Sequence, residues 1–461
     1  MGGIALRTFS YIPHTEADRK KMMDFLGITD VSELFADIPE SVRLTRPLAL
    51  PPALAEITLE RHMAGLARKN LDFGQVVSFL GAGAYDHYQP SVVEAIVGRS
   101  EFYTSYTPYQ PEISQGMLQA IFEYQTMVAE LTGMDLANAS MYDGPTALGE
   151  AGLVCCAHTG RNKLLVARSV HPEYREVLAT YAAGQSVEVV ELPWRDGTLD
   201  LDALAAACDD QVAGVLVQYP NFFGRIEDLA KIAEIVHRHG ALLVTSVYPV
   251  ALGVLQPPGQ CGADIVVAEG QSLGNSMSFG GPYLGIMAAR KELMRKLPGR
   301  IVGETTDAQG RRGFVLTLQA REQHIRREKA TSNICSNQAL NALAATVYLA
   351  YLGKQGIVEL AVQNYHKAHY LQRTLTQMEG VEAVFPGPFF NEFVVRIPRP
   401  VNAVQTQLLE QGYLFGLDLG RFYEDLQGTV LLNVTELRTR EELDGLCAAV
   451  KALCGEREAV R

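Results

Sequence analysis

The feature that most constrains this fold is an alternation of short apolar runs with helical patterns between about residues 71 and 330. Amphipathic segments such as 201–209 and 226–239 separate the runs, as crossover helices separate parallel strands. The runs are 163–167 (KLLVA), 187–192 (VEVVEL), 214–218 (GVLVQ), 241–245 (ALLVT), 264–268 (DIVVA) and 283–287 (YLGIM). Apolar residues on both sides of a strand indicate a sheet covered on both faces. We therefore expect a large α/β domain with a mostly parallel sheet.

The two flanks of this region have different patterns. Residues 1–70 are polar and helical, with helices expected at 16–26 and 54–66, and this indicates an N-terminal arm. Residues 331–461 mix helices with two strand-like runs, which favours a smaller α+β domain. The expected elements of that domain are two long helices after residue 338, strands at 393–397 and 429–433, and helices at 401–411 and 440–453.

Composition excludes several classes of protein. The chain has 461 residues, 48% of them hydrophobic, and a net charge of −12 without long blocks of like charge. Nucleic acid and anionic membranes are therefore poor partners. The longest nearly apolar stretch, 339–352, is shorter than a membrane span, and the first residues lack the pattern of a signal peptide. The seven cysteines show neither a CxxC pair nor Cys/His ligand spacing, so we expect a cytoplasmic protein with reduced thiols and no metal.

Lysine is almost missing from the strand-rich region. The architecture suggests the large domain of an enzyme that uses pyridoxal phosphate (PLP), and such an enzyme holds its cofactor as a Schiff base on a lysine. Between Lys163 and Lys291 the only lysine is Lys231. It falls on the polar face of helix 226–239, four residues after Glu227, which is the spacing of an exposed ion pair. The chain therefore lacks a suitable nucleophile of its own.

The segment 141–149 (MYDGPTALG) is the best candidate for an anion cradle. Asp143 or Gly144 can cap the helix that follows, and Pro145 suits its first position. Free N–H groups at such a helix start attract an anion. The same residues also fit an ordinary helix start, and both interpretations remain open here.

A loop rich in tyrosine and proline, 102–116, is the second candidate site. Prolines stiffen it, and tyrosines offer stacking faces with a hydroxyl at the tip. A proline-stiffened surface loop is the alternative interpretation. Asp86 and His87, just upstream, either line the same cleft or are turn residues. The candidate site residues of the loop are Tyr103, Tyr106, Tyr109 and Gln110.

The third candidate is the polar stretch 331–337 (TSNICSN), which follows a charged segment at the expected domain junction. Thr331, Ser332 and Asn333 favour a site because they belong to a run of polar side chains at that junction. The preceding basic residues either receive an anion or form a solvated helix face.

Several of these segments together resemble the glycine cleavage system P-protein family. The likeness extends over essentially the whole chain and is greatest to subunit 1 of the two-subunit form, which corresponds to the N-terminal half of the single-chain form. The segments that resemble the family are 106–116 (YTPYQPEISQG), 125–133 (QTMVAELTG), 138–144 (NASMYDG), 270–274 (GQSLG), 279–285 (FGGPYLG) and 331–338 (TSNICSNQ).

The resemblance implies an aminotransferase-like (fold type I) chain that works with a related catalytic subunit. The catalytic half of the family has His-Lys where Gln271 and Ser272 stand here. Similar chains have an aspartate at the position of Tyr248 and an alanine at that of Pro145. A phenol cannot hold a pyridinium by charge, so the Tyr248 departure argues against PLP bound within this chain.

The activity implied by the resemblance is glycine decarboxylation with transfer of the aminomethyl group to the lipoyl arm of H-protein. PLP would be carried by the partner subunit in a heterodimer or heterotetramer. Tyr103, Tyr106, Tyr109, Gln110, Thr331, Ser332 and Asn333 would line the entry of glycine and the lipoyl arm. Two alternatives remain: a self-sufficient PLP enzyme that uses Lys231 or Lys291, and a catalytically silent scaffold of the same fold.

Overall fold

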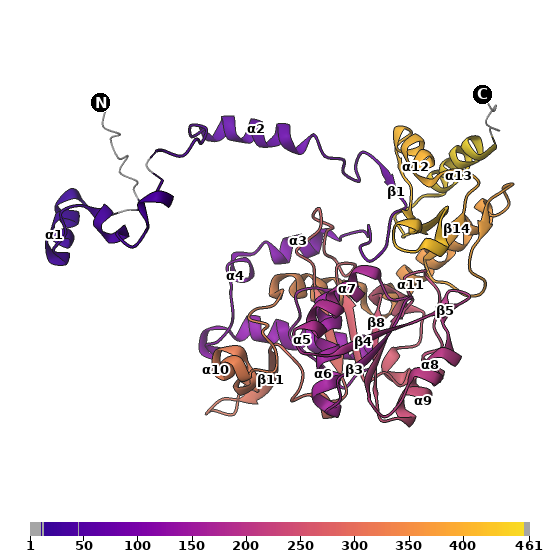
Figure 1. The fold of residues 1–461 in the computed structure, drawn as a ribbon, viewed down its shortest axis with the longest axis horizontal. Helices are drawn as coiled ribbons and strands as arrows, with labels where there is room; N and C mark the ends of the chain where they lie inside the picture. The colour runs from indigo at the N-terminus through magenta and orange to yellow at the C-terminus, as the bar shows by residue number, and fades with distance from the viewer. Residues whose placement is uncertain (1–10, 12, 45, 456–461) are drawn as a thin grey trace. The chain divides into compact units, whose positions relative to one another are not determined.

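The computed structural model describes residues 11, 13–44 and 46–455, which fall into two compact units divided between Asn70 and Leu71 (Figure 1). The smaller unit contains α1 (Glu16–Leu26) and α2 (Glu56–Ala67). Thr15 caps α1 by accepting a hydrogen bond from the Asp18 N–H, and the Asp18 carboxylate accepts one from the Thr15 N–H. None of the described residues of this unit is buried. Helix α1 is therefore stabilised by a local capping box rather than by a buried core.

The larger unit is built around a seven-stranded sheet with the order β2-β10-β9-β8-β7-β3-β4. The five strands from β9 to β4 are parallel to their neighbours, and β10 runs opposite to both β9 and β2. This confirms the expected mostly parallel sheet. The strands are β2 (Leu136–Ala137), β3 (Lys163–Ala167), β4 (Glu188–Leu192), β7 (Val212–Tyr219), β8 (Leu242–Val247), β9 (Ile265–Glu269) and β10 (Gly285–Ala289).

Helices cover this sheet and make its central strands buried on both faces. Every residue of β9 and β10 is buried, as expected when both sets of alternating side chains meet helices. Helix α6 packs across β7, β8, β9 and β10, α9 packs on β8, and α5 packs on β2 and β10. The helices of this part of the chain are α3 (Ser91–Val97), α4 (Ser100–Tyr103), α5 (Gln115–Thr132), α6 (Gly144–Thr159), α7 (Pro172–Ala183), α8 (Leu201–Ala207) and α9 (Leu229–Arg238).

The C-terminal elements form a second sheet with the order β13-β14-β17-β16 and antiparallel pairing. Figure 1 shows β14, α12 and α13 gathered together in orange to yellow. The elements are α11 (Ala339–Leu375), β13 (Glu382–Ala383), β14 (Glu392–Arg396), α12 (Val401–Glu410), β15 (Tyr413–Leu414), β16 (Leu417–Asp418), β17 (Thr429–Asn433) and α13 (Arg440–Gly455). Helix α11 joins the two expected long helices across a kink at Gly353, whose φ is +59°. A domain boundary near residue 330 stays a prediction.

Smaller elements complete the larger unit. The strands β11 (Ile301–Thr306) and β12 (Arg312–Thr317) form a hairpin, and the short helix α10 (Gln323–Arg326) follows it. The remaining pairs are β1 (Val77–Ser78) with β15, and β5 (Trp194–Arg195) with β6 (Thr198–Leu199). Across the described part of the chain, no helix is both long and apolar enough to cross a membrane.

One detail of the sequence prediction is wrong. Lys231 forms an ion pair of 2.8 Å with Asp228, three residues earlier, and not with Glu227. Glu227 lies outside α9, is buried, and accepts hydrogen bonds from Ser169 and the Leu199 N–H. The expected spacing misled because α9 begins at Leu229 and not at residue 226, so Glu227 has no helical neighbours. Lys231 itself is exposed, with 68% of its side chain accessible.

Candidate functional site

The carboxyl ends of the parallel strands gather the polar residues of the sheet. Strand β9 ends at Glu269, β8 is followed by Tyr248, and α6 begins at Gly144 beside them. In open α/β sheets, ligands bind at this edge.

The N-terminus of α6 is occupied by the protein's own carboxylates. Asp143 caps the helix by accepting a hydrogen bond from the Thr146 N–H at 2.9 Å. Of the two caps expected from the sequence, Asp143 or Gly144, the structure has Asp143. The Gly144 N–H donates to Oε2 of Glu269 at 3.0 Å. The other Glu269 oxygen accepts from the N–H groups of Gln271 and Leu284 at 3.0 and 2.9 Å. Because the N–H groups of Gly144 and Thr146 already have these partners, the contacts favour an ordinary capped helix start over an anion cradle.

Burial changes the protonation of Glu269. Removal from water disfavours the charged form and raises the pKa of this carboxyl to about 7, although its three N–H partners act in the opposite direction. The group is therefore partly neutral near physiological pH, which lowers the cost of its position inside the protein.

Aromatic side chains fill the space above Glu269. The remaining cavity has a volume of about 20 Å³, which is room for about one water molecule. A Cβ atom at Gly144 would lie 2.4 Å from the Tyr174 hydroxyl. The cavity is lined by Gly83, Tyr85, His171, Tyr174, Gln218, Ser246, Val247, Tyr248 and Glu269. None of these lining residues is a lysine.

Pyridoxal phosphate does not fit this part of the chain. The cavity is an order of magnitude smaller than an ordinary small-molecule site. Tyr248 is buried, and its hydroxyl forms a hydrogen bond with Nε2 of His87. Ser272 is buried as well, and its hydroxyl has no hydrogen-bond partner among the described residues.

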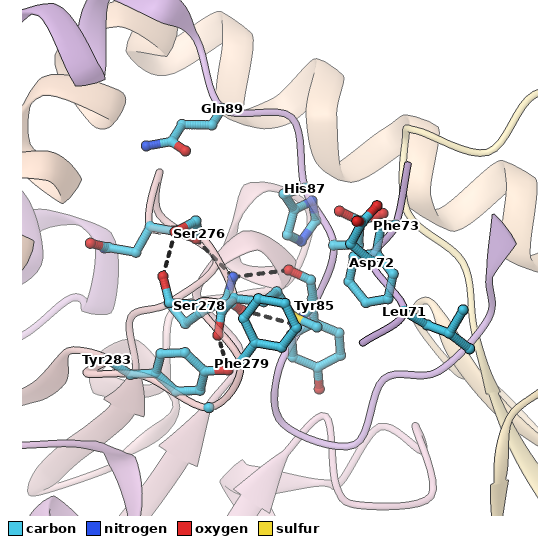
Figure 2. Close-up of a pocket in the computed structure, with 15 residues that line it drawn as sticks. Leu71, Asp72, Phe73, Tyr85, His87, Gln89, Ser276, Ser278, Phe279 and Tyr283 are labelled. Carbon is cyan, nitrogen blue, oxygen red and sulfur yellow. Dashed lines mark hydrogen bonds between the residues drawn. The ribbon is translucent and has the colours of Figure 1, made fainter. Parts of the chain in front are cut away.

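A larger cavity of about 520 Å³ lies beside Gln271 (Figure 2). The Gln271 side chain holds the wall of this cavity by donating to the carbonyls of Tyr85 and Asn275 at 3.0 and 2.9 Å. Ser278 and Phe279 also line this cavity, and they have positive φ values of +41° and +51°, which side chains of this kind rarely adopt. Asp86 and His87 also line this cavity, so they lie in a cleft, but no residue of the 102–116 loop shares it.

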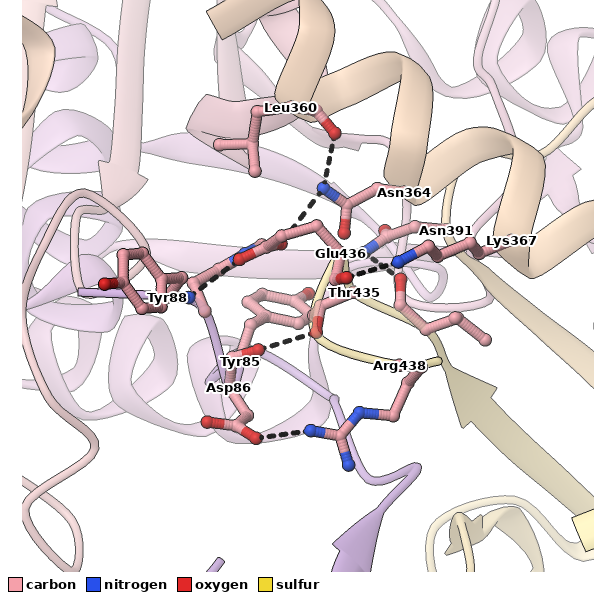
Figure 3. Close-up of polar contacts among 12 residues, drawn as sticks. Tyr85, Asp86, Tyr88, Leu360, Asn364, Lys367, Asn391, Thr435, Glu436 and Arg438 are labelled. Carbon is pink, nitrogen blue, oxygen red and sulfur yellow. Dashed lines mark hydrogen bonds and ion pairs between the residues drawn. The ribbon is translucent and has the colours of Figure 1, made fainter. Parts of the chain in front are cut away.

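The segment around Asp86 is fixed by the C-terminal part of the same unit (Figure 3). Arg438 pairs with the Asp86 carboxylate at 3.1 Å, and the Thr435 hydroxyl donates to the Asp86 carbonyl at 2.7 Å. Glu436 accepts from the Tyr88 N–H at 2.7 Å and contacts Nδ1 of His87 at 2.7 Å. This segment is therefore a structural link as well as a cavity wall.

The structure places the predicted tyrosine loop at the surface. Tyr103 ends α4, and Tyr103 and Tyr106 are 67% and 75% exposed. Neither they, Tyr109 nor Gln110 lines any of the cavities described above. Tyr109 is nevertheless anchored to another part of the chain, because its hydroxyl accepts a hydrogen bond from Arg300 at 3.2 Å.

The predicted polar stretch lines a third cavity, of about 450 Å³. Thr331, Ser332 and Asn333 all face it, together with Glu150 of α6. The Ser332 hydroxyl donates to Oε1 of Glu150 at 2.5 Å. Burial raises the pKa of Glu150, while that hydrogen bond partly offsets the shift.

Sequence reasoning missed Glu269, Glu150 and Arg300. Glu269 had a usable signal, because a carboxylate that directly follows four apolar strand residues stands at the edge where ligands bind. Glu150 lies inside a small-residue helix, and Arg300 follows a single glycine, so neither had a local pattern that distinguished it from a surface charge.

Comparison with known proteins agrees with this architecture. The family described as glycine cleavage system P-protein matches residues 9–450. A protein of Anoxybacillus flavithermus named probable glycine dehydrogenase (decarboxylating) subunit 1 is 57% identical over 95% of this chain and 97% of its own length. The words "subunit 1" imply that this relative has a partner subunit.

Solved structures have the same fold. A glycine decarboxylase (P-protein) of the glycine cleavage system, in inhibitor-bound form, superposes with a TM-score of 0.88 and 45% identity over 96% of this chain and 100% of that chain. The sphingosine-1-phosphate lyase of Burkholderia pseudomallei has a TM-score of 0.65 at 14% identity, over 90% of this chain and 94% of its own, which shows the fold alone. The expected aminotransferase-like (fold type I) class is confirmed.

Proposed function

Because this chain belongs to the glycine cleavage system P-protein family, we propose that it is subunit 1 of a two-subunit glycine dehydrogenase (decarboxylating). In this proposal a second subunit carries the pyridoxal phosphate and its Schiff-base lysine. The present chain completes the active site, and the complex decarboxylates glycine and passes the aminomethyl group to the lipoyl arm of H-protein.

The observation that carries this proposal is the closed space at the carboxyl edge of the sheet. Glu269, Tyr174 and Tyr248 line the carboxyl edge of the sheet, where open α/β folds bind ligands, and the cavity among them is only about 20 Å³. The two lysines considered from the sequence are elsewhere. Lys231 pairs with Asp228 on an exposed helix face, and Lys291 follows β10, where its N–H donates to Asp135.

The contribution of this chain would come from its surface rather than from its closed pocket. The exposed Tyr103 and Tyr106 offer aromatic faces to a partner's active site, and Tyr109 offers a hydroxyl that is already oriented. Thr331, Ser332 and Asn333 offer polar groups at the mouth of the 450 Å³ cavity. These residues would guide glycine and the lipoyl arm by contact and orientation, and would exclude water.

Reconstitution tests this function. Release of labelled CO2 from carboxyl-labelled glycine is measured with H-protein for this chain alone, for the partner subunit alone, and for the two mixed. We expect turnover from the mixture only. Turnover by this chain alone would overturn the proposal, and so would full turnover by the partner alone.

A catalytically silent scaffold of the same fold is the second candidate, because a chain with a filled pocket could also serve only to bind other proteins. The two functions differ at the tyrosine loop, because a scaffold needs no oriented hydroxyl near a partner's active site. Single-turnover rates of the mixed enzyme with Tyr106 and Tyr109 replaced by Phe separate them: a scaffold predicts rates unchanged at full assembly.

We also propose that the protein acts in the cytoplasm. The composition supports this, since the cysteines are all free among the described residues and the net charge of −12 favours solubility. Fractionation of cells that express the native protein, followed by immunoblotting, tests it: recovery in the membrane pellet would contradict the assignment.

A further inference from the structure

Arg300 lies between the two segments that the sequence predicts to line the site. It directly precedes β11, and its residue is only 5% exposed. Its Nη2 donates both to the Tyr109 hydroxyl at 3.2 Å and to the Cys335 carbonyl at 2.8 Å. Its Nη1 donates to Oδ1 of Asn337 at 3.3 Å. One guanidinium therefore connects the tyrosine loop to the 331–338 segment.

Other contacts fix the Tyr109 end of this connection. The Arg300 guanidinium lies over the Tyr109 ring, with 5.6 Å between Cζ and the ring centroid. The His324 ring meets the Tyr109 ring edge-on at 5.7 Å. Nε of Arg300 lies 3.9 Å from the Glu322 carboxylate, which compensates the buried charge. Tyr109 is thus held on two sides although almost half of it is exposed.

The 331–338 end is also held in place. The Asn337 side chain donates to the Ser140 hydroxyl at 2.9 Å, and the Gln338 N–H donates to the same oxygen at 3.1 Å. The Cys335 N–H donates to the Tyr142 hydroxyl at 3.0 Å. Ser140 and Tyr142 lie just before α6. These hydrogen bonds therefore attach the 331–338 segment to the core formed by the sheet and α6.

We propose that Arg300 is the positioning residue that sets the tyrosine loop and the 331–338 segment in one geometry toward the partner's active site. This inference rests on the proposed function and deepens it. Only a planar fork of donors reaches a phenol, a backbone carbonyl and an amide at once, whereas a lysine ammonium in the same place is a point charge that reaches fewer of them. Burial of the Arg300 guanidinium costs stability, since its Nε has no hydrogen-bond partner among the described residues, and the hydrogen bonds of Nη1 and Nη2 offset part of that cost.

The first test measures the two segments without any reaction. Amide hydrogen exchange of the full chain is compared for wild type, Arg300→Lys and the control Arg225→Lys. Arg225 matches Arg300, because it is buried, its Nε has no hydrogen-bond partner within the described part of the chain, and it donates to the backbone carbonyl of Pro388. We expect Arg300→Lys to speed exchange in 104–112 and 331–338 together, and Arg225→Lys to leave both at the wild-type rate. Wild-type exchange in both segments of Arg300→Lys would overturn the inference.

The second test uses the reconstituted two-subunit enzyme. We expect Arg300→Lys to lower kcat/KM for glycine about tenfold or more, with the partner's cofactor absorbance and the assembly unchanged, and Arg225→Lys to stay within about twofold. In a cycle with Tyr109→Phe, the Arg300→Lys effect should shrink, because part of its action passes through the Tyr109 hydroxyl. Strictly additive effects would contradict the positioning role.

The outcomes also separate this inference from the proposed function. If Tyr109→Phe and substitutions at 331–333 lower turnover while Arg300→Lys behaves like Arg225→Lys, only the positioning role fails. If substitutions in both segments leave turnover unchanged, the proposed site itself fails, whatever hydrogen exchange shows.

Discussion

Two regions of the larger unit contain buried charged groups, and they use them in opposite ways. At the carboxyl edge of the sheet, Glu269 accepts three N–H groups and is enclosed by tyrosines, so all its bonds end inside the protein. At the other region, the bonds of Arg300 end on Tyr109 and Cys335, which both reach the surface. The comparison teaches that the carboxyl edge of the sheet, where this class of fold usually binds ligands, is here packed like a core. The buried guanidinium of Arg300, in contrast, holds residues that reach the surface.

The comparison predicts that changes at the closed edge alter stability and changes at the surface alter turnover. The largest effect is expected for Gly144→Ala. The added Cβ would lie 2.4 Å from the Tyr174 hydroxyl and 3.0 Å from the Glu269 backbone nitrogen, so overpacking should cost about 1–3 kcal/mol of unfolding free energy. Thermal unfolding measures this loss of stability. We expect turnover per assembled enzyme to stay at the wild-type level.

Gly116→Ala is the matched control for that experiment. Gly116 lies in helix α5, and a Cβ there would meet nothing within 4 Å. We expect unchanged or slightly raised stability, since alanine suits a helix better than glycine. Equal losses in the two variants would show that the closed edge is not tightly packed.

A pH dependence of stability is the next effect in size. Burial raises the pKa of Glu392 from 4.5 to about 7, although the Ala82 N–H and the Tyr85 hydroxyl donate to it. The folded state then binds this proton more tightly than the unfolded state. Its contribution to stability is present below pH 4.5 and is lost as the pH rises to about 7.

Glu392→Gln should therefore remove part of this loss. We expect the variant to be more stable than wild type by about 1–2 kcal/mol at pH 8, and to have no such advantage at pH 5. Urea unfolding at pH 5, 6, 7 and 8 measures the difference. A variant that is equally destabilised at every pH would mean that the hydrogen bonds, and not the charge, dominate.

A smaller effect is expected at the surface for Tyr106→Phe combined with Tyr109→Phe. Loss of two hydroxyls should lower kcat/KM of the reconstituted enzyme about three- to tenfold, or about 1 kcal/mol, without changing assembly. Tyr351→Phe is the control, because Tyr351 is also an exposed tyrosine, 64% accessible, on helix α11. Turnover that falls equally in the control would remove the loop from the site.

The smallest effect is expected for Lys231 and Lys291, the two lysines that a self-sufficient PLP enzyme would have to use. Lys231→Gln and Lys291→Gln should each leave glycine decarboxylation within about twofold of wild type, because Lys231 points to solvent and Lys291 lies outside all three cavities. Loss of activity in either variant, measured as CO2 release by the reconstituted enzyme, would revive the self-sufficient enzyme.

The sequence predicted the sheet well because each strand is a local apolar run. The run at 264–268, for example, lies within one residue of β9, and buried strands need little information beyond their own residues. The direction of β10 was not predictable in this way, since pairing is a non-local property. Glu227 shows the limit for helices: without the start of α9, its spacing to Lys231 indicated a partner that it does not have.

The site was predictable only where residue type was sufficient. A missing lysine is visible in the sequence, and polar residues at 331–333 could be selected by composition. That Glu269 fills the helix start, or that Arg300 connects two segments far apart in sequence, depends on side-chain geometry across the fold. No local pattern encodes such contacts, because each partner alone is an ordinary charged residue.

The most direct test of the central claim is borohydride trapping after addition of pyridoxal phosphate, followed by absorbance and peptide mapping. It is performed on this chain alone, and then on the chain with its partner subunit. We predict no trapped cofactor on the chain alone and, in the mixture, a single trapped lysine on the partner. A reduced adduct on any lysine of this chain that is required for turnover would contradict the account.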